Sequence, residues 1–284
     1  CKMLKIITDS CADLEESFVQ EHNIGLANLH LQVDGANYTP GEDITTAQAL
    51  AKIAQAQEMP KTSQPSPHAY QQLFAQTEPV GESLCLTVSS DLSGSFNSAN
   101  LAAQTSAAPV HTVDTRMGSF AQGFQVMLAA LMSEKGHSLA EIKTTLQDFY
   151  QKSSIIVILE KYDNAIKSGR MNKYAGKIIE KLNIRGIIEV LDGKVVTVDK
   201  ARGADKTFQK MLERIASKAE DFSQMVIGIA HFNNPEMAEK YRAALDDLLH
   251  PARIYMSLLN PAIGVYCDNG GIVISVAPNP YTFA

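Results

Sequence analysis

The sequence predicts an α/β protein with two domains: an N-terminal parallel sheet with flanking helices, followed by a C-terminal α+β layer. A unit of strand, polar loop and helix occurs three times in the first half, and this repeat is typical of a parallel sheet. In the second half, Asp192-Gly193 stands between two apolar runs and predicts a tight hairpin, a turn that joins antiparallel strands. We therefore divide the chain into residues 1–152 and residues 153–284.

Short apolar runs and helical periodicity define the elements of the first half. The turn signal Asp34-Gly35 ends one predicted strand, and polar loops follow most of the others. We expect strands at residues 4–8, 24–33, 84–88, 109–113 and 155–159, and helices at residues 13–22, 45–57, 119–134 and 138–152 and from about residue 67.

The second half mixes hairpin strands with amphipathic helices. The hairpin is predicted from residues 187–191 and 194–198, and Gly270-Gly271 after Asp268-Asn269 predicts a further turn. We expect the remaining helices at residues 204–219 and 235–249, and the remaining strands at residues 225–230, 253–258 and 271–276.

Composition excludes several classes of protein. The 284 residues carry a formal net charge of −6, and no basic run is interleaved with aromatics, so nucleic acid is not an expected partner. The four cysteines have neither zinc-site nor disulfide-framework spacing, which favours a reducing cytoplasm. No apolar run approaches the roughly 20 residues that span a bilayer. We interpret Cys1 and Lys2 as an expression scar before a native start at Met3.

Three hydroxyl-rich loops are the main candidates for a binding site. They are Thr62-Ser63-Gln64-Pro65-Ser66, residues 89–95 with Ser93-Gly94-Ser95, and residues 114–119 ending in Gly118-Ser119. Because loops after parallel strands converge at one sheet edge, we expect them to form a socket for a small anion. Helix-start N–H groups and hydroxyl donors bind carboxylates or phosphates. The alternative, that these residues only cap helices, stays open.

Catalytic chemistry is less well supported. Asp9 and Asp114 follow core strands and would suit a base or metal ligand, but Asp-Ser and Asp-Thr steps commonly cap loops. His68 and His231 belong to no recognisable Ser-His-Asp set, and no nucleophile elbow occurs. A hydrolase or transferase using Asp9, Ser93 and Asp114 therefore lacks an identifiable base. We expect a protein that holds its ligand without catalysis and needs no metal.

A family resemblance adds the identity of the ligand. The segments Thr8-Asp9-Ser10, Lys61 to Ser66, Ser89 to Ser95, Val113-Asp114-Thr115 with Gly118-Ser119, and Ser168-Gly169-Arg170-Met171 resemble the DegV family in order and spacing. This resemblance covers nearly the whole chain. It implies two α/β domains with a long-chain fatty acid in a buried slot between them.

The resemblance also implies roles for single residues. Thr62 and Ser93 would contact the fatty acid carboxylate, while Ser63, Gly94 and Ser119 would shape the socket. Two arginines match family positions near the cleft or at a partner surface, namely Arg170 and Arg202. Where many members have Gly-x-His-x-Gly-Pro-Gly, this chain reads Gly264-Val265-Tyr266-Cys267-Asp268-Asn269-Gly270. Tyr266 thus replaces a carboxylate-binding histidine with a neutral hydrogen-bond donor.

From this resemblance we expect a cytoplasmic, non-catalytic lipid-binding protein with a long-chain fatty acid as ligand and no cofactor. It would present the carboxylate to a separate ATP-dependent fatty acid kinase for acyl-phosphate formation. Transient membrane contact is compatible with this role. A regulatory or carrier protein for a different amphiphile is the alternative, and Tyr266 favours it more than a histidine would.

Overall fold

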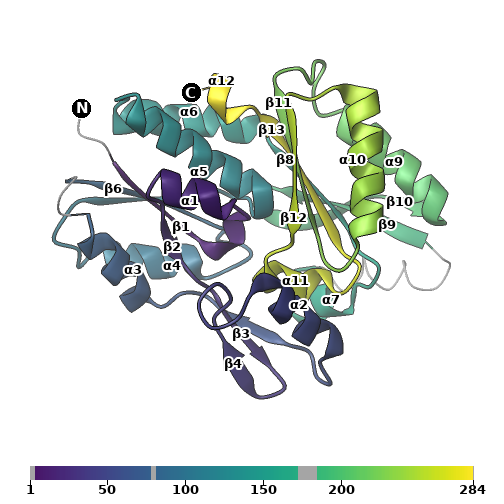
Figure 1. The fold of residues 1–284 in the computed structure, drawn as a ribbon, viewed down its shortest axis with the longest axis horizontal. Helices are drawn as coiled ribbons and strands as arrows, with labels where there is room; N and C mark the ends of the chain where they lie inside the picture. Colours follow the sequence, from purple (N-terminus) through teal and green to yellow (C-terminus); the bar gives the residue numbers. More distant parts are fainter. Residues whose placement is uncertain (1–3, 78–80, 172–183, 284) are drawn as a thin grey trace.

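The computed structural model describes residues 4–77, 81–171 and 184–283, which form three sheets (Figure 1). The first is a four-stranded sheet in which every neighbouring pair is parallel. Its strands, in spatial order, are β2 (Gly25–Ala27), β1 (Lys5–Asp9), β6 (Ser83–Thr87) and β7 (Val110–Asp114). The predicted parallel sheet is confirmed, and β1 and β6 are buried along their whole length because helices cover both faces.

Helices flank this sheet as the repeat of strand, loop and helix predicts. In Figure 1, α3 and α4 lie below it, and α5 and α6 lie above it. The bounds are α3 (Pro67–Ala75), α4 (Ser95–Ala103), α5 (Ser119–Glu134) and α6 (Leu139–Gln151). Ser66 and Ser138 cap α3 and α6 through their side chains, whereas α4 and α5 begin after Gly94 and Gly118 without a side-chain cap.

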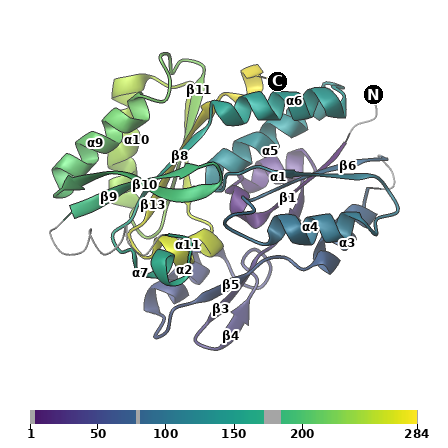
Figure 2. The same ribbon diagram turned by 180° about the vertical axis from the view of Figure 1, so that it is seen from behind.

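The second sheet has six strands and mixed direction, in the order β10-β9-β8-β13-β11-β12. Its strands are β8 (Ser154–Ile158), β9 (Ile184–Leu191), β10 (Lys194–Arg202), β11 (Met225–His231), β12 (Arg253–Leu258) and β13 (Ile272–Pro278). Two helices, α9 (Ala204–Ala216) and α10 (Pro235–Leu249), cover its outer face (Figure 2). The predicted hairpin is confirmed, with Asp192 and Gly193 at φ of 49° and 82°.

Helix α5 packs against both large sheets. It contacts β1 and β6 on one side and β11 and β13 on the other, and nearly all of its residues are buried. Two glycines permit close approach of α5 to η1 and to β11. A Cβ on Gly123 would lie 2.2 Å from the Ala12 carbonyl oxygen, and one on Gly228 of β11 would lie 2.3 Å from Phe120. The two sheets are thus held at either side of one apolar helix.

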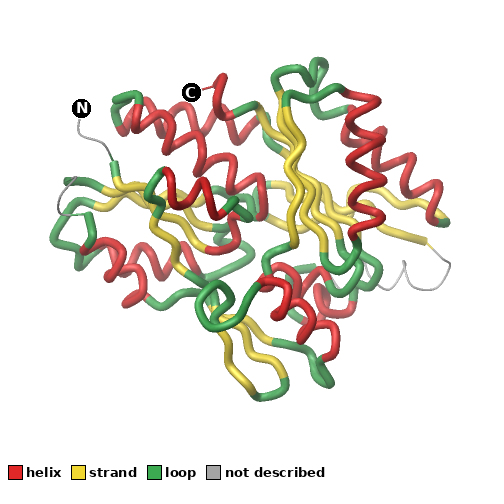
Figure 3. Tube along the Cα trace, in the orientation of Figure 1, coloured by secondary structure: helices red, strands yellow, loops and turns green. Residues whose placement is uncertain are grey.

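A third, small antiparallel sheet was not predicted. It consists of β4 (Ala36–Tyr38), β3 (His30–Val33) and β5 (Lys61–Ser63), and it lies at the bottom of Figure 3 beside α2 (Thr46–Gln55). The single strand expected at residues 24–33 is wrong, because the chain leaves the parallel sheet after Ala27 and enters the small sheet at His30. Thr62 and Ser63 of the first hydroxyl segment correspondingly belong to a short strand, whereas residues 64–66 form the expected loop.

Short elements complete the fold. The helix expected at residues 13–22 is shorter, α1 (Glu16–Glu21), and a 3-10 turn, η1 (Ser10–Ala12), precedes it. Three further helices were not predicted: α7 (Asp163–Lys167), α11 (Pro261–Cys267) and α12 (Pro280–Phe283). Within the described ranges, no helix combines the length and hydropathy that a membrane crossing requires.

Candidate ligand-binding site

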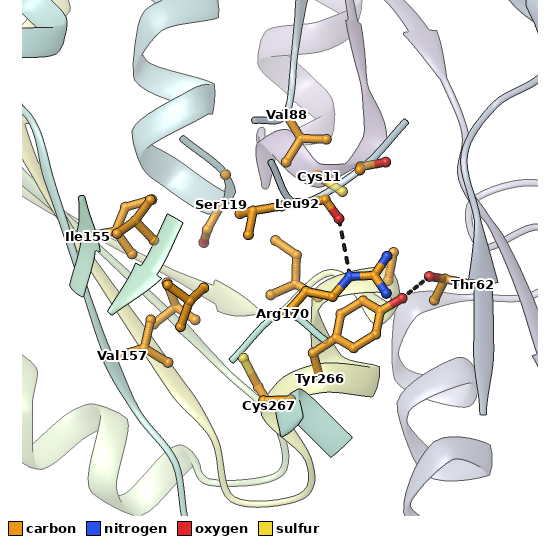
Figure 4. Close-up of a pocket in the computed structure, with 18 of the residues that line it drawn as sticks. Cys11, Thr62, Val88, Leu92, Ser119, Ile155, Val157, Arg170, Tyr266 and Cys267 are labelled. Atoms are coloured by element: carbon orange, nitrogen blue, oxygen red, sulfur yellow. Dashed lines mark hydrogen bonds between the residues drawn. The ribbon is translucent and has the colours of Figure 1, made fainter. Parts of the chain in front are cut away.

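A cavity lies where loops of the parallel sheet meet the inner face of the six-stranded sheet (Figure 4). Its empty space, including the part open to solvent, is about 960 Å³. The wall of this cavity draws on both halves of the chain, from Cys11 to Val273.

Most of the wall is apolar. Residues on alternate positions of a strand share a face, so β8 and its continuation present Ile155, Val157 and Leu159 to the cavity. The hairpin adds Ile188, Val190 and Val195 by the same alternation. The remaining apolar lining comes from Leu29, Val88, Leu92, Ala165, Ala262, Ile263 and Val273. Such a wall suits a hydrocarbon chain.

Polar side chains gather at one end of the cavity, which we call the mouth: Thr62, Ser93, Arg170 and Tyr266. All four are half-buried. The Thr62 and Tyr266 hydroxyls share a short hydrogen bond, drawn at the right of Figure 4. That bond joins β5 of the small sheet to α11, which connects β12 and β13 of the six-stranded sheet. The sequence-predicted Thr62, Ser93, Arg170 and Tyr266 are thus brought to one cavity.

Arg170 bridges the two sides of the mouth. Its Nε donates to the Leu92 carbonyl at 3.3 Å and its Nη1 to the Ser168 carbonyl at 2.9 Å. The guanidinium lies 4.7 Å from the centroid of the Tyr266 ring, within cation–π range. These contacts fix a positive charge beside the hydroxyls and hold the Leu92-Ser93 segment against the other half of the molecule.

The second hydroxyl loop lies close to the Gln64 side chain at position 94. A Cβ on Gly94 would lie 2.6 Å from Gln64 Nε2, the movable end of an exposed side chain, so the first two hydroxyl segments meet here. The Ser93 and Ser95 hydroxyls lie 3.0 Å apart and share a hydrogen bond. Gln64 also lines the cavity, a role that its place in the motif Lys61 to Ser66 did not indicate.

Ser119 lies on the inner wall, beside Ile155 and across the cavity from Thr62 and Tyr266 (Figure 4). It is buried and has a φ of 50°, and its hydroxyl donates to Asp13 Oδ2 at 2.6 Å. The expectation that all three hydroxyl segments form one socket is therefore only partly met. Two segments meet at the mouth, and the third contributes to the interior.

Two candidate residues do not reach the cavity. Ser63 follows Thr62 on β5, and successive strand residues face opposite sides, so Ser63 is exposed in a different shallow hollow. Arg202 is exposed at the end of β10 that pairs with Ile184, whereas Val195 lies near the hairpin turn and lines the cavity. The structure thus places Ser63 outside the expected socket, and the exposed position of Arg202 fits the other expectation for it, a partner surface.

The two aspartates considered for catalysis serve as caps. Asp9 is fully buried and accepts hydrogen bonds from the backbone N–H groups of Cys11 at 3.1 Å and Val88 at 2.8 Å. Burial raises its pKa to about 6. Asp114 accepts from the Ser90 hydroxyl at 2.6 Å and from the Arg116 N–H at 2.9 Å. The capping interpretation is confirmed for both.

Neither the histidines nor the cavity thiols supply a reactive group. His68 is exposed on α3, and burial lowers the pKa of His231; neither residue lines the cavity. Cys11 and Cys267 do line it, but burial raises the pKa of Cys267 to about 12 and that of Cys11 well above its ordinary value. Both thiols therefore stay protonated at neutral pH and are poor nucleophiles.

Comparisons with known proteins agree with the motifs. The model of an uncharacterised family, DegV, matches residues 3–279. A DegV domain-containing protein from Listeria innocua is 29% identical over 271 residues, 95% of this chain and 96% of the relative. A Thermus thermophilus structure described as fatty acid binding by a DegV family protein has a TM-score of 0.90 and 23% identity. The match covers 97% of this chain and 99% of the other. The structure of a stearic acid-binding protein from Eubacterium ventriosum has a TM-score of 0.88 and 21% identity, and the match covers 99% of this chain and 100% of that protein.

Proposed function

We propose that this chain, which belongs to the DegV family, binds one long-chain fatty acid with its tail in the cavity and its carboxylate at the mouth. The observation that carries the proposal is the polarity gradient of the cavity. Half-buried hydroxyls and an arginine stand at one end, and strand residues such as Ile155 and Val190 line the remainder. A fatty acid has the same division between a charged head and an apolar tail.

The tail supplies most of the affinity in this proposal. Burying a methylene group stabilises a complex by roughly 0.8 kcal/mol, so about fifteen methylenes contribute on the order of 10 kcal/mol before the costs of association. The head group then needs mainly orientation. Proteins of the same fold are described as binding fatty acids, and one of them as binding stearic acid.

The mouth can hold a carboxylate without neutralising it. Thr62 and Tyr266 have two hydroxyl hydrogens between them, and their mutual bond uses one. The second is free to donate to the ligand, and Ser93 offers a further hydroxyl. Arg170 adds positive charge, but two of its donors are already bonded to carbonyl oxygens. A carboxylate held in this way retains a lone pair for reaction.

We further propose that the bound carboxylate is presented to a separate ATP-dependent kinase. A carboxylate oxygen would attack the γ-phosphorus of ATP, the bond from that phosphorus to the β,γ-bridging oxygen would break, and ADP would leave acyl phosphate behind. The half-buried state of Thr62, Ser93 and Tyr266 supports access from outside. Because ATP is the phosphate donor, we place this step in the cytoplasm.

Single hydroxyl deletions test this role. Thr62→Ala and Ser93→Ala should remove acyl-phosphate formation while stearic acid binding weakens only about tenfold, because the tail still binds. Binding is measured by displacement of a fluorescent fatty acid. Acyl phosphate is trapped with hydroxylamine after adding ATP and kinase-containing fractions from the source organism.

Ser63→Ala is the matched control, since Ser63 adjoins Thr62 but faces away from the cavity. It should leave both measurements unchanged. Parallel loss of binding and phosphotransfer in Thr62→Ala would argue against a head group that is only oriented there. Stronger displacement by lysophosphatidylcholine than by stearic acid would instead favour a different amphiphile.

A further inference from the structure

The half-buried carboxylate of Asp13 stands behind the inner wall of the cavity. Asp13 Oδ2 accepts the Ser119 hydroxyl at 2.6 Å, and Asp13 Oδ1 accepts the Asn260 backbone N–H at 2.9 Å. Both Asp13 and Ser119 have left-handed backbone conformations, with φ of 45° and 50°. Non-glycine residues occupy this region at some cost, so the contact between them is maintained against local strain.

This carboxylate joins three elements that shape the cavity. Asp13 ends η1, Ser119 begins α5, and Asn260 caps α11 by accepting from the Ala262 N–H at 2.8 Å. Asn260 also donates through Nδ2 to the Ser10 carbonyl at 2.6 Å. Because α11 carries Tyr266, Asp13 connects the inner wall to the element that forms part of the mouth.

The proton on Ser119 depends on the state of Asp13. A serine hydroxyl has a single hydrogen, and an ionised carboxylate only accepts. With Asp13 ionised, Ser119 donates to it and turns only lone pairs toward the cavity. With Asp13 protonated, the acid can donate to Ser119 Oγ, and the serine hydrogen becomes free to point into the cavity. Asp13 thus decides whether the inner wall offers an acceptor or a donor.

We propose that Asp13 is a positioning residue of the cavity, which sets the direction of the Ser119 hydroxyl and takes up a proton when a fatty acid enters. This inference rests on the proposed function. A fatty acid displaces water from the cavity and brings a second negative charge into it. Both effects disfavour an ionised carboxylate behind the wall, so binding and protonation of Asp13 favour each other.

The surroundings of Asp13 permit titration near neutral pH. Burial raises its pKa to about 7, although the bonds from Ser119 and Asn260 oppose the rise. The neighbouring thiols, Cys11 of η1 and Cys267 of α11, are protonated at this pH. On the outer side lie Tyr255, Tyr281 and Glu15, the last 3.8 Å from Arg253 of β12. Helix α5 has no titratable residue before Glu134.

Calorimetry measures the proton directly. Dodecanoate, below its micelle concentration, is titrated into the full chain in phosphate and in Tris at several pH values between 6.5 and 8.5. The difference in heat between buffers gives the protons taken up per ligand. For the native chain we expect uptake that rises with pH toward one proton, because more of the empty protein then has Asp13 ionised.

Three variants assign the proton. Asp13→Asn should bind dodecanoate with no net uptake across this range. Ser119→Ala removes a donor to the ionised form, so uptake should begin at higher pH. Asp9→Asn, which changes a buried carboxyl that does not line the cavity, should behave as the native chain.

The outcomes separate two kinds of failure. Binding with equal uptake in Asp13→Asn and the native chain, or loss of uptake in Asp9→Asn, would overturn the assignment to Asp13 and leave the proposed function intact. Absence of dodecanoate and stearic acid binding in the native chain would overturn the proposed function, and this inference with it.

Discussion

Thr62 and Tyr266 share a hydrogen bond at the cavity mouth, and the Arg170 guanidinium lies over the tyrosine ring. A histidine at position 266, which the family resemblance implies, would add a titratable charge there. The tyrosine instead keeps the charge on Arg170 and contributes a hydroxyl. At the scale of residues, this substitution should change how binding of a fatty acid depends on pH.

Replacement of Tyr266 tests the expected role of its hydroxyl and the expected pH dependence of binding. Tyr266→Phe retains the ring beneath Arg170 but loses the hydroxyl, so stearic acid affinity should fall about five- to tenfold, equivalent to one hydrogen bond of about 1 kcal/mol. Tyr266→His should bind more tightly at pH 6 than at pH 8, because imidazolium attracts a carboxylate. Displacement titrations at both pH values measure these effects. Unchanged affinity in Tyr266→Phe would show that its hydroxyl does not contact the ligand.

Much of the mouth could be predicted from the sequence, because its residues stand in compact motifs. Thr62, Ser93 and Tyr266 were expected at the site and line the cavity. Ser63 was also expected, but a motif does not show which of two adjacent hydroxyls faces the ligand. Asp13 was missed because its partners, Ser119 and Asn260, are 106 and 247 residues away in the chain.

Among the elements, the hairpin of β9 and β10 closes one wall of the cavity, and its turn touches the hydroxyl loops. The Ser89 hydroxyl donates to the Gly193 carbonyl at 2.8 Å. Two ion pairs flank this bond, Arg116 with Asp192 at 3.6 Å and Lys194 with Asp91 at 3.7 Å. Because both pairs are largely exposed they contribute little stability, and the buried contact at Gly193 is the main attachment of the turn.

The turn of the small sheet provides a matched comparison. Asp34-Gly35 has φ of 46° and 82°, nearly the same as Asp192-Gly193, but a Cβ on Gly35 would meet nothing within 4 Å. A Cβ on Gly193 would lie 2.6 Å from the Ser89 hydroxyl. Gly35→Ala should therefore lower the free energy of unfolding by about 1–2 kcal/mol through backbone strain alone.

Gly193→Ala should lower the free energy of unfolding further than Gly35→Ala does. It should also speed the release of a bound fluorescent fatty acid, because the turn must move away from Ser89. Urea unfolding and stopped-flow displacement by excess stearic acid provide the two measurements. Equal stability losses and equal release rates in both variants would show that the turn contact does not hold the cavity wall in place.

Helices and strands were predicted correctly where the apolar pattern extends over many residues, and they were missed where the element is short. Helix α10 and strand β12 have the expected bounds, since each carries an extended apolar pattern between clear breaks. Strands β4 and β5 have three residues each and α7 has five, too few to establish a period. The small sheet depends on pairing between His30 and Ser63, a tertiary contact that no local pattern indicates.

At the scale of the whole molecule, the cavity is a consequence of two sheets meeting around α5. The glycines at positions 123 and 228 bring this helix close to η1 and β11, while the start of the helix, at Ser119, reaches the cavity wall. Each half supplies part of the lining. The mouth combines β5 and the second hydroxyl loop with Arg170 and α11, so ligand binding should require the intact chain.

Native mass spectrometry of the full chain, purified without detergent, decides whether the cavity holds one long-chain fatty acid. We expect an added mass equal to one long-chain fatty acid per chain, confirmed by organic extraction. After delipidation and incubation with stearic acid, the same stoichiometry should return. A protein that stays at its polypeptide mass in both experiments, or that carries a ligand without a carboxylate, would contradict it.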